Sequence, residues 1–549
     1  MNPSGLRRFS LATATFMMLA ASCQLHAAGQ SVFNVRDYGA TGHKSADARP
    51  AIQKAIDACA KAGGGTVYLP PGEYTSGTLY LRSHVRFYVE AGATLYASED
   101  PKAFNGEPIP SKAALLFGEN VENISIEGRG TIDGQAEYEW RPDDFEHAYD
   151  HKDLMQALGK STMRSFPKDQ HTRTVYPHLV WLGRCKDVRI TGLSFLHSFS
   201  WTFAFYDCER MVIDGLYIYT SLKEAVWADG IDIDSSRDIH ISNCDIETGD
   251  DCIIFISGTG WGPALPCENI TVTNCKLSSA SAAIKFSEGN RVAIRKIVVD
   301  NCVITNCNRG ITFQIVLGGT VSDVILSNLT IDLHRFDWFW AGDGNPFDFG
   351  IKTLSEWNRV PPKPDDPGPG TIRNVVIRNV IAHGQGSSLI SGHPKSWLEG
   401  ISFENIKLFL STDPAAPYDK AVHALEFRYA RDLKLRNVEV IWDKPALDRW
   451  ESALSFNSIE GLEVDGFTGR PAWIDREFPA ISFTNVADAV VRNSKAAQGT
   501  NVFLKISGSG SRDVALEGND FRLAKVPYQL APDVAGKTVT TEANLLPSR

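Results

Sequence analysis

The chain has 549 residues and a formal net charge of −10. This acidic balance disfavours binding to polyanions, so we expect no nucleic-acid partner, and an acidic polysaccharide would need a local basic pocket. Beyond the N-terminal region no apolar stretch reaches the roughly 20 residues of a membrane helix, which predicts that the protein has no membrane span.

The N-terminal segment 1–28 is typical of a secretory signal peptide. Arg7 and Arg8 precede the apolar run 16–21, and a small-residue cleavage site follows. We therefore expect an exported protein, either periplasmic or extracellular. Cys23 offers the alternative of a lipid anchor, although its spacing from the preceding leucine is poor.

Residues 29–100 are expected to form an N-terminal cap and the first coils of a repeating fold. Apolar side chains recur at i, i+3, i+4 and i+7 across 51–60, and Pro50 suits a first helical turn, so this segment predicts an amphipathic helix. Such a helix would close the open end of a solenoid core. The glycine run 63–65 could suggest a phosphate loop, but no Lys-Ser or Lys-Thr pair follows it, which favours a turn.

A repeat of the form apolar-x-Asn-apolar runs through the segment 101–535. Its asparagines are Asn243, Asn274, Asn301, Asn328, Asn379, Asn405 and Asn437, with weaker copies at Asp465 and Asn493. The first steps are 31, 27 and 27 residues long, which is too short for propeller blades of roughly 40 residues. Alternating apolar segments flank each asparagine and predict several short strands per repeat. The pattern therefore indicates an all-β protein built as a parallel β-helix.

The repeated asparagine and the residue after it both have a structural explanation. Asparagine tolerates the left-handed backbone conformation, and its amide can bond to the asparagines of the coils above and below. Cysteine follows three of the asparagines, at Cys244, Cys275 and Cys302, which predicts a ladder of buried thiols. A disulfide between Cys252 and Cys267 is the alternative, since export would permit one.

Two insertions interrupt the repeat, a charged one near 135–174 and an aromatic one near 334–370. Long loops on a rigid scaffold usually carry function, so we expect both to wall a groove. The aromatic residues of the second insertion are Phe336, Trp338, Phe339, Trp340, Phe347, Phe349 and Trp357. Trp338 and Trp340 are expected to stack on the substrate.

Two acidic clusters, 227–234 and 248–253, lie one repeat apart, with 21 positions between Asp229 and Asp250. Neighbouring coils are roughly 4.8 Å apart, so Asp229, Asp250 and Asp251 are expected to meet on one face. Carboxylates at one glycosidic bond supply the acid and base that glycoside hydrolysis needs. The alternatives are solvated turn residues and a calcium site. The sequence has no Cys-x-x-Cys pair and no His-rich spacing, so we expect no metal and no cofactor.

These motifs resemble those of glycoside hydrolase family 28, the polygalacturonase and rhamnogalacturonan hydrolase family. The matching segments are 35–40, 51–56, 200–202, 229–236 and 249–252. The resemblance implies a right-handed, single-stranded, pectin lyase-like parallel β-helix and a pectic polysaccharide or oligosaccharide as substrate. It also implies that Asp250 is the general acid and that Asp229 and Asp251 hold the attacking water, with inversion at the anomeric carbon. An inverting pair leaves a gap of about 6.5–9.5 Å between its carboxyl groups.

The chain departs from the family's pattern at three places. Trp227 and Ala228 stand where the family has Asn-Thr, Ala282 stands for its usual His, and Gln314 stands for its usual Lys. In polygalacturonases these basic residues hold a galacturonate carboxylate, and rhamnogalacturonan hydrolases also lack the His. We therefore expect unsubstituted polygalacturonan to be a poor substrate and a pectic chain with a neutral sugar, such as rhamnose, to be a better one.

Lys285 and Arg309 are the expected substitutes for the missing positive charges. The full set of expected substrate-binding residues is Asp232, Lys285, Arg309, Gln314, Trp338 and Trp340. Two other classes of protein remain open: a β-helix polysaccharide lyase, which would need calcium and a basic proton abstractor, and a non-catalytic carbohydrate-binding solenoid. We expect a monomer, and the sequence leaves endo and exo action undecided.

Overall fold

The structure is a computed structural model that describes residues 31–104, 112–138, 177–225, 227–336, 344–411, 422–443 and 448–547. The predicted signal peptide, Cys23, most of the charged insertion, Trp338 and Trp340 lie outside these residues. The helices among them are too short and too polar to cross a membrane.

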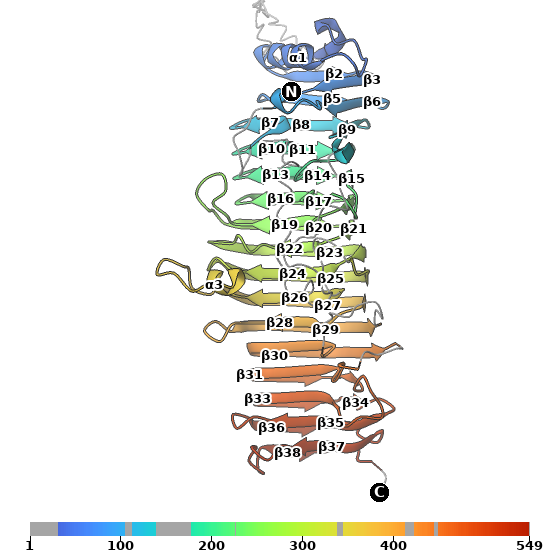
Figure 1. Cartoon of the computed structure of the whole chain (residues 1–549), viewed down its shortest axis with the longest axis vertical. Coiled ribbons are helices and arrows are strands. Elements are labelled where there is room, and N and C mark those ends of the chain that lie inside the picture. The colour runs from blue at the N-terminus through green and yellow to red at the C-terminus, as the bar shows by residue number, and fades with distance from the viewer. Residues whose placement is uncertain are drawn as a thin grey trace, which may run out of the picture.

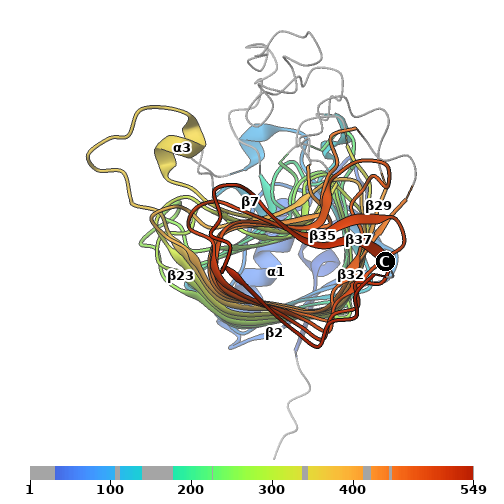
Figure 2. The same cartoon turned by 90° about the horizontal axis from the view of Figure 1, so that it is seen from below.

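The described strands form one continuous parallel sheet that winds into a right-handed β-helix. Figure 1 shows the coils stacked along the long axis from the N-terminal cap to the C-terminus, and Figure 2 looks along that axis. Each strand pairs in parallel with the equivalent strand of the next coil, as β13 does with β16 and β16 with β19. The predicted all-β parallel β-helix is confirmed.

The strands fall into three faces. The first face comprises β4 (Leu79–Tyr80), β7 (Ala114–Glu119), β10 (His178–Gly183), β13 (Phe203–Tyr206), β16 (Ile231–Asp234), β19 (Ile253–Ile256), β22 (Ala282–Phe286), β24 (Arg309–Ile315), β26 (Asn345–Ile351), β28 (Ser388–Ser391), β35 (Thr500–Ser507) and β37 (Ala524–Leu530). The second face comprises β1 (Val32–Asn34), β2 (Gly65–Leu69), β5 (Val85–Val89), β8 (Glu122–Gly128), β11 (Lys186–Thr191), β14 (Glu209–Asp214), β17 (Arg237–Ser242), β20 (Cys267–Thr273), β36 (Arg512–Glu517) and β38 (Val539–Glu542). The third face comprises β3 (Gly72–Ser76), β6 (Ala93–Ala97), β9 (Thr131–Asp133), β12 (Ser194–Leu196), β15 (Tyr217–Tyr219), β18 (Asp245–Thr248), β21 (Lys276–Ser279), β32 (Thr468–Gly469) and β34 (Lys495–Ala496).

Longer strands turn the corners between faces in the C-terminal half. These are β23 (Ala293–Cys307), β25 (Thr320–Leu333), β27 (Thr371–Gly384), β29 (Leu398–Leu410), β30 (Leu425–Trp442), β31 (Leu454–Asp465) and β33 (Pro479–Arg492). Two α-helices are described, α1 (Arg49–Lys61) and α3 (Leu354–Asn358).

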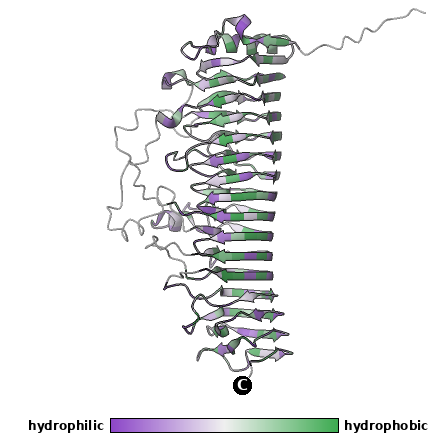
Figure 3. Cartoon of the chain, turned by 90° about the vertical axis from the view of Figure 1, so that its right-hand side faces the viewer, coloured by the Kyte–Doolittle hydropathy of each residue, from purple (hydrophilic) through white to green (hydrophobic). Residues whose placement is uncertain are grey.

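Alternate residues of each strand point into the core, which explains why Figure 3 shows hydrophobic and hydrophilic residues mixed along the strands. Phe286, Phe313 and Phe349 stack on one another in successive coils, with ring centroids 4.0 and 4.1 Å apart. All three rings are fully buried. Burial of a phenylalanine side chain stabilises a fold by about 1.5–3 kcal/mol, so such ladders hold the coils together.

The asparagine ladder is confirmed. Asn243, Asn274 and Asn301 have φ of 56, 56 and 54°, in the left-handed region. The Asn274 side chain donates to Asn243 Oδ1 at 3.3 Å, and Asn301 donates to Asn274 Oδ1 in turn. Asn328 breaks the chain of asparagines and donates to Asp300 Oδ1 at 2.7 Å instead.

The thiols of Cys244, Cys275 and Cys302 are buried, as predicted. All described cysteines are free, so the alternative disulfide between Cys252 and Cys267 is wrong. Each of these two thiols instead faces a backbone carbonyl in the core, Cys252 at 3.1 Å and Cys267 at 3.5 Å.

The N-terminal cap forms as predicted. In α1 the side chains of Ala51, Ile52, Ala55, Ile56 and Cys59 are buried against the first coils, and a proline occupies the first turn. The three glycines at 63–65 have φ of 91, 117 and 145°, and they turn the chain into β2. These backbone angles favour glycine and confirm the turn.

The aromatic insertion is only partly a loop. Phe347 and Phe349 lie on β26, which belongs to the first face, and both rings are fully buried. The expectation that they wall a groove is therefore wrong, because alternate residues of this strand face the core. Trp357 lies on α3, which Figures 1 and 2 show standing out from the coils, and this side chain does line a groove.

Candidate active site

Asp229, Asp250 and Asp251 lie just before two adjacent strands of the first face. β16 begins shortly after the first of these residues and β19 shortly after the other two, and the strands pair in register. The backbones approach closely here, since a Cβ atom on Gly230 would lie 2.4 Å from the Cys252 carbonyl oxygen. Glycine is required at this point for the two acidic segments to meet.

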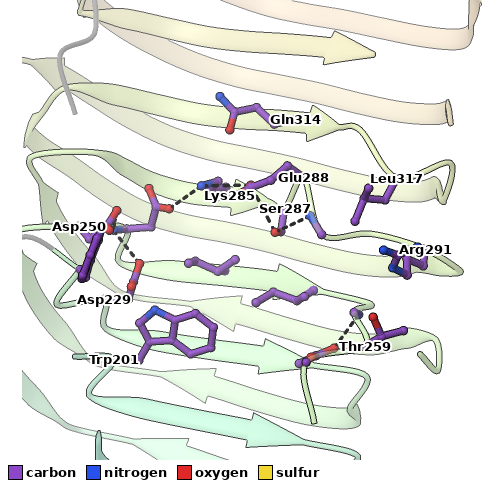
Figure 4. Close-up of a pocket in the computed structure, with 18 of the residues that line it drawn as sticks. Trp201, Asp229, Asp250, Thr259, Lys285, Ser287, Glu288, Arg291, Gln314 and Leu317 are labelled. Carbon is purple, nitrogen blue, oxygen red and sulfur yellow. Dashed lines mark hydrogen bonds and ion pairs between the residues drawn. The ribbon is translucent and has the colours of Figure 1, made fainter. Parts of the chain in front are cut away.

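One carboxylate oxygen from each of the three residues lies within 4.8 Å of the others. The Asp251 backbone N–H donates to Asp250 Oδ1 at 2.9 Å and to Asp229 Oδ1 at 3.1 Å. Figure 4 shows Asp229 and Asp250 together at one end of the groove. The predicted convergence is confirmed. The nearest oxygens lie closer together than the gap of about 6.5–9.5 Å expected between the carboxyl groups of an inverting pair, because a single amide binds both acids.

The three side chains are shielded from water, with exposed fractions of 2, 6 and 1 % for Asp229, Asp250 and Asp251. The alternative of solvated turn residues is therefore wrong. The carboxylates are close enough to share one cation, as are those of Asp133 and Glu137 with the ring of His197.

Asp250 is well suited to give up a proton. Burial raises the pKa of this carboxyl to about 8, and the neighbouring Asp251 carboxylate adds to the rise. Burial likewise raises the pKa of Asp229 well above its usual range, and the charge of Asp250 adds to that rise. An acid with a pKa near 8 stays protonated at neutral pH and can protonate a leaving group.

Lys285 holds Asp251 from the groove side. Its Nζ lies 3.0 Å from Asp251 Oδ2 and 3.3 Å from Glu288 Oε2, and Figure 4 draws both contacts. Burial opposes the ammonium charge, but the two carboxylates outweigh burial and raise the pKa of Lys285. The other oxygen of Asp251 accepts a hydrogen bond from the Ala282 N–H at 2.8 Å. The residue that replaces the family's His thus binds the acid through its backbone.

Arg309 and Gln314 both line the groove, where the sequence places them. Arg309 is 8 % exposed, its Nη2 donates to Ser281 Oγ at 2.9 Å, and its buried Nε has no hydrogen-bond partner among the described residues. Arg309 therefore brings a positive charge to the floor of the groove.

Asp232 differs from the prediction that it binds substrate. Its side chain is fully buried, it does not line the groove, and neither carboxyl oxygen has a hydrogen-bond partner in the described part of the chain. Burial, and then the charge of Asp251, raise the pKa of Asp232 well above its usual range. Asp232 pairs with Ile254, which lines the groove, so its side chain points to the outer side of β16 and is covered there by neighbouring groups.

The groove has a volume of about 430 Å³, and four tryptophans line it: Trp201, Trp227, Trp261 and Trp357. Sequence reasoning missed Trp261 and Glu288. Trp261 lies in the loop after β19, with its ring centroid 5.5 Å from that of Trp201. The longer step of 31 residues after Asn243 was the signal for this loop.

Trp227 has a backbone φ of 66°, in the left-handed region. That conformation costs most residues roughly 1–2 kcal/mol, whereas asparagine tolerates it. Trp227 stands where the resemblance places an asparagine, so the departure introduces backbone strain beside Asp229 and puts an indole in the groove.

Residues 59–333 match the model of glycosyl hydrolases family 28. The β-helix and the clustered carboxylates agree with this match. The chain belongs to this family and is a glycoside hydrolase.

Two relatives and one solved structure illustrate the similarity. A probable polygalacturonase of Vitis vinifera is 25% identical over 416 residues, which cover 71% of this chain and 76% of the relative. An exo-poly-alpha-D-galacturonosidase of Dickeya chrysanthemi is 25% identical over 488 residues, covering 80% of this chain and 75% of the relative. The Yersinia enterocolitica family 28 exopolygalacturonase has a TM-score of 0.59 at 21% identity, covers 80% of this chain and 79% of its own, and shares the fold.

Proposed function

We propose that this glycoside hydrolase is exported, acts as a monomer and cleaves glycosidic bonds in pectic polysaccharides or oligosaccharides. The observation that carries the proposal is the buried Asp250 carboxyl with a pKa of about 8 beside Asp251, which Lys285 contacts at 3.0 Å. The names of the relatives, polygalacturonase and exo-poly-alpha-D-galacturonosidase, support a pectic substrate. The signal-like segment 1–28 supports export.

In the proposed reaction, Asp250 gives its proton to the glycosidic oxygen as the bond from that oxygen to the anomeric carbon breaks. A water molecule attacks the anomeric carbon from the opposite face and loses a proton to a carboxylate. Because burial raises the pKa of Asp229, we assign Asp251 as the base and Asp229 as the group that orients the water.

The short distance between the carboxylates favours a second mechanism. Retaining glycosidases place their carboxyl groups about 5–5.5 Å apart and use one as a nucleophile. We nevertheless assign inversion, which the resemblance to family 28 implies and which agrees with the proposed roles of Asp251 and Asp229 in activating and orienting a water molecule. Proton NMR of the first-formed sugar tests this assignment: an inverted anomer supports it, and a retained anomer makes one aspartate the nucleophile.

For specificity, we propose that Arg309 contacts a sugar carboxylate and that the tryptophans stack on less charged sugar faces. Lys285 has less capacity for a uronate, since two carboxylates already bind it. Gln314 would bind hydroxyl groups rather than a carboxylate.

Product analysis on homogalacturonan and on rhamnogalacturonan tests the substrate class and separates the remaining alternatives. A lyase would form unsaturated products that absorb ultraviolet light, and its activity would be lost in EDTA and restored by calcium. A non-catalytic binding protein would release no sugar from either polymer.

A further inference from the structure

A second pocket, of about 370 Å³, adjoins the groove that holds the three aspartates. Gln314 and Trp357 line both cavities. The groove and the second pocket therefore adjoin on the outer side of the first face, and Figure 1 shows α3 beside this face.

Four successive strands build the floor of the second pocket. Gln314, Gly350, Ser391 and Arg428 occupy paired positions on β24, β26, β28 and β30. Four strand spacings separate the strand of Lys285 from that of Arg428, which is roughly 19 Å. The far end of the pocket is thus too distant to hold the sugar whose bond is cleaved.

The wall of the second pocket is held in place by specific contacts. A capping box between Thr353 and Glu356 begins α3. Glu356 Oε1 also lies 3.1 Å from Nε2 of His393, which is 7 % exposed and follows β28. Lys352 Nζ lies 5.1 Å from the centroid of the Trp357 ring. A wall fixed in this way needs little ordering when a ligand binds.

Positive charge faces the pocket at its far end. Arg428 Nε donates to Glu426 Oε1 at 2.6 Å, and no partner of its two terminal nitrogens is found among the described residues. A guanidinium with both terminal nitrogens available suits a carboxylate, which it binds bidentately. Asp348 and Glu356 also line the pocket, and His393 pairs with the latter. Trp357 and Tyr429 offer ring faces for a sugar.

We propose that the second pocket is a distal subsite that binds an acidic sugar residue of the substrate chain, several residues away from the cleaved bond. Arg428 binds the carboxylate of this sugar, and Trp357 stacks on its ring. The floor has space for the ring at Gly350, where an added Cβ atom would meet no other atom within 4 Å. The inference rests on the proposed pectic substrate and adds a place where chain length and charge are recognised.

Binding to a variant that is expected not to turn over tests the subsite. In an Asp250→Asn background, the Kd of galacturonate oligosaccharides from the disaccharide to the hexasaccharide is measured by calorimetry. We expect Arg428→Gln to weaken binding of the longer oligosaccharides about tenfold, since the variant loses charge-assisted hydrogen bonds to the sugar carboxylate. We expect Gly350→Leu, which fills the floor, to have a similar effect.

Two matched variants serve as controls. Arg436→Gln removes a positive charge from the same strand, where Arg436 pairs with Glu463 on the exterior. Gly368→Leu adds the same bulk at an exposed glycine with no atom within 4 Å. Neither should change the dependence of Kd on chain length, and the melting temperature of each variant shows whether it is folded.

Three outcomes are distinguishable. If Arg428→Gln binds only the longer oligosaccharides about tenfold more weakly, the subsite is supported. This holds even if the wild-type protein releases no sugar, and in that case only the proposed function is wrong. If the wild type hydrolyses pectic chains but Arg428→Gln binds every length as tightly as its parent, the subsite is wrong and the function stands. Longer oligosaccharides that bind no tighter than the disaccharide also overturn the subsite.

Discussion

Asp250 owes its proposed role to its surroundings, since burial and a neighbouring carboxylate raise its pKa to about 8. We expect Asp250→Asn to lower kcat by about 10²- to 10⁴-fold, because an amide of the same shape cannot donate the proton. Hydrolysis assays with purified protein check this, with Asp245→Asn, a change at a partly exposed residue on the third face, as control. Turnover near that of the wild type in Asp250→Asn would remove Asp250 from the mechanism.

The same raised pKa links activity and stability to pH. Since the proposed acid must be protonated, kcat should fall as the pH rises through about 8. The folded pKa exceeds the ordinary value of about 3.9, so the contribution of this group to stability is full below pH 4 and is lost as the pH rises through about 8. Calorimetric melting temperatures at pH 5 and pH 9 should therefore differ less in Asp250→Asn than in the wild type, and an equal difference would contradict the argument.

Trp227 combines backbone strain with a position in the groove. We expect Trp227→Asn to raise the free energy of unfolding by about 1 kcal/mol, because asparagine tolerates the left-handed conformation, and to lower kcat/KM because the indole is lost. Urea denaturation and hydrolysis assays measure the two effects. If both stability and kcat/KM fall, the indole serves the fold rather than the substrate.

At the scale of elements, the aromatic insertion divides between β26 and α3. Phe349→Ala should cost about 3–5 kcal/mol of unfolding free energy, because it leaves a cavity in the stacked core. Trp357→Ala should leave the urea midpoint close to that of the wild type and raise KM, because this side chain lines the groove. A large loss of stability in Trp357→Ala, or a raised KM with unchanged stability in Phe349→Ala, would contradict this division.

At the scale of the whole molecule, the net charge of −10 repels a chain that carries one carboxylate per sugar. We expect kcat/KM for unsubstituted polygalacturonan to be about tenfold lower than for an oligosaccharide in which neutral sugars alternate with uronates. Raising the salt concentration from about 0.01 to 0.15 M should bring the two kcat/KM values closer together, because salt screens long-range repulsion. Efficient random cleavage of polygalacturonan at low salt would contradict this expectation.

Local rules explain what the sequence by itself determined. The period of the repeat, the left-handed asparagines such as Asn274 and the amphipathic face of α1 depend on residues close together in the chain. The spacing between Asp229 and Asp250 is one coil, so a repeat of that length was enough to predict that they meet.

Tertiary structure decided which side chains are buried and which ones meet in the groove. Both depend on the register between strands and on the loops that pack over them. Only the packing of neighbouring coils places Phe349 in the core and covers Asp232 on the outer side of β16. The contact of Lys285 with Asp251, and the approach of Trp261 to the groove, join segments that no local pattern relates. The raised pKa of the central acid likewise arises only once three coils enclose it, since burial is its largest cause.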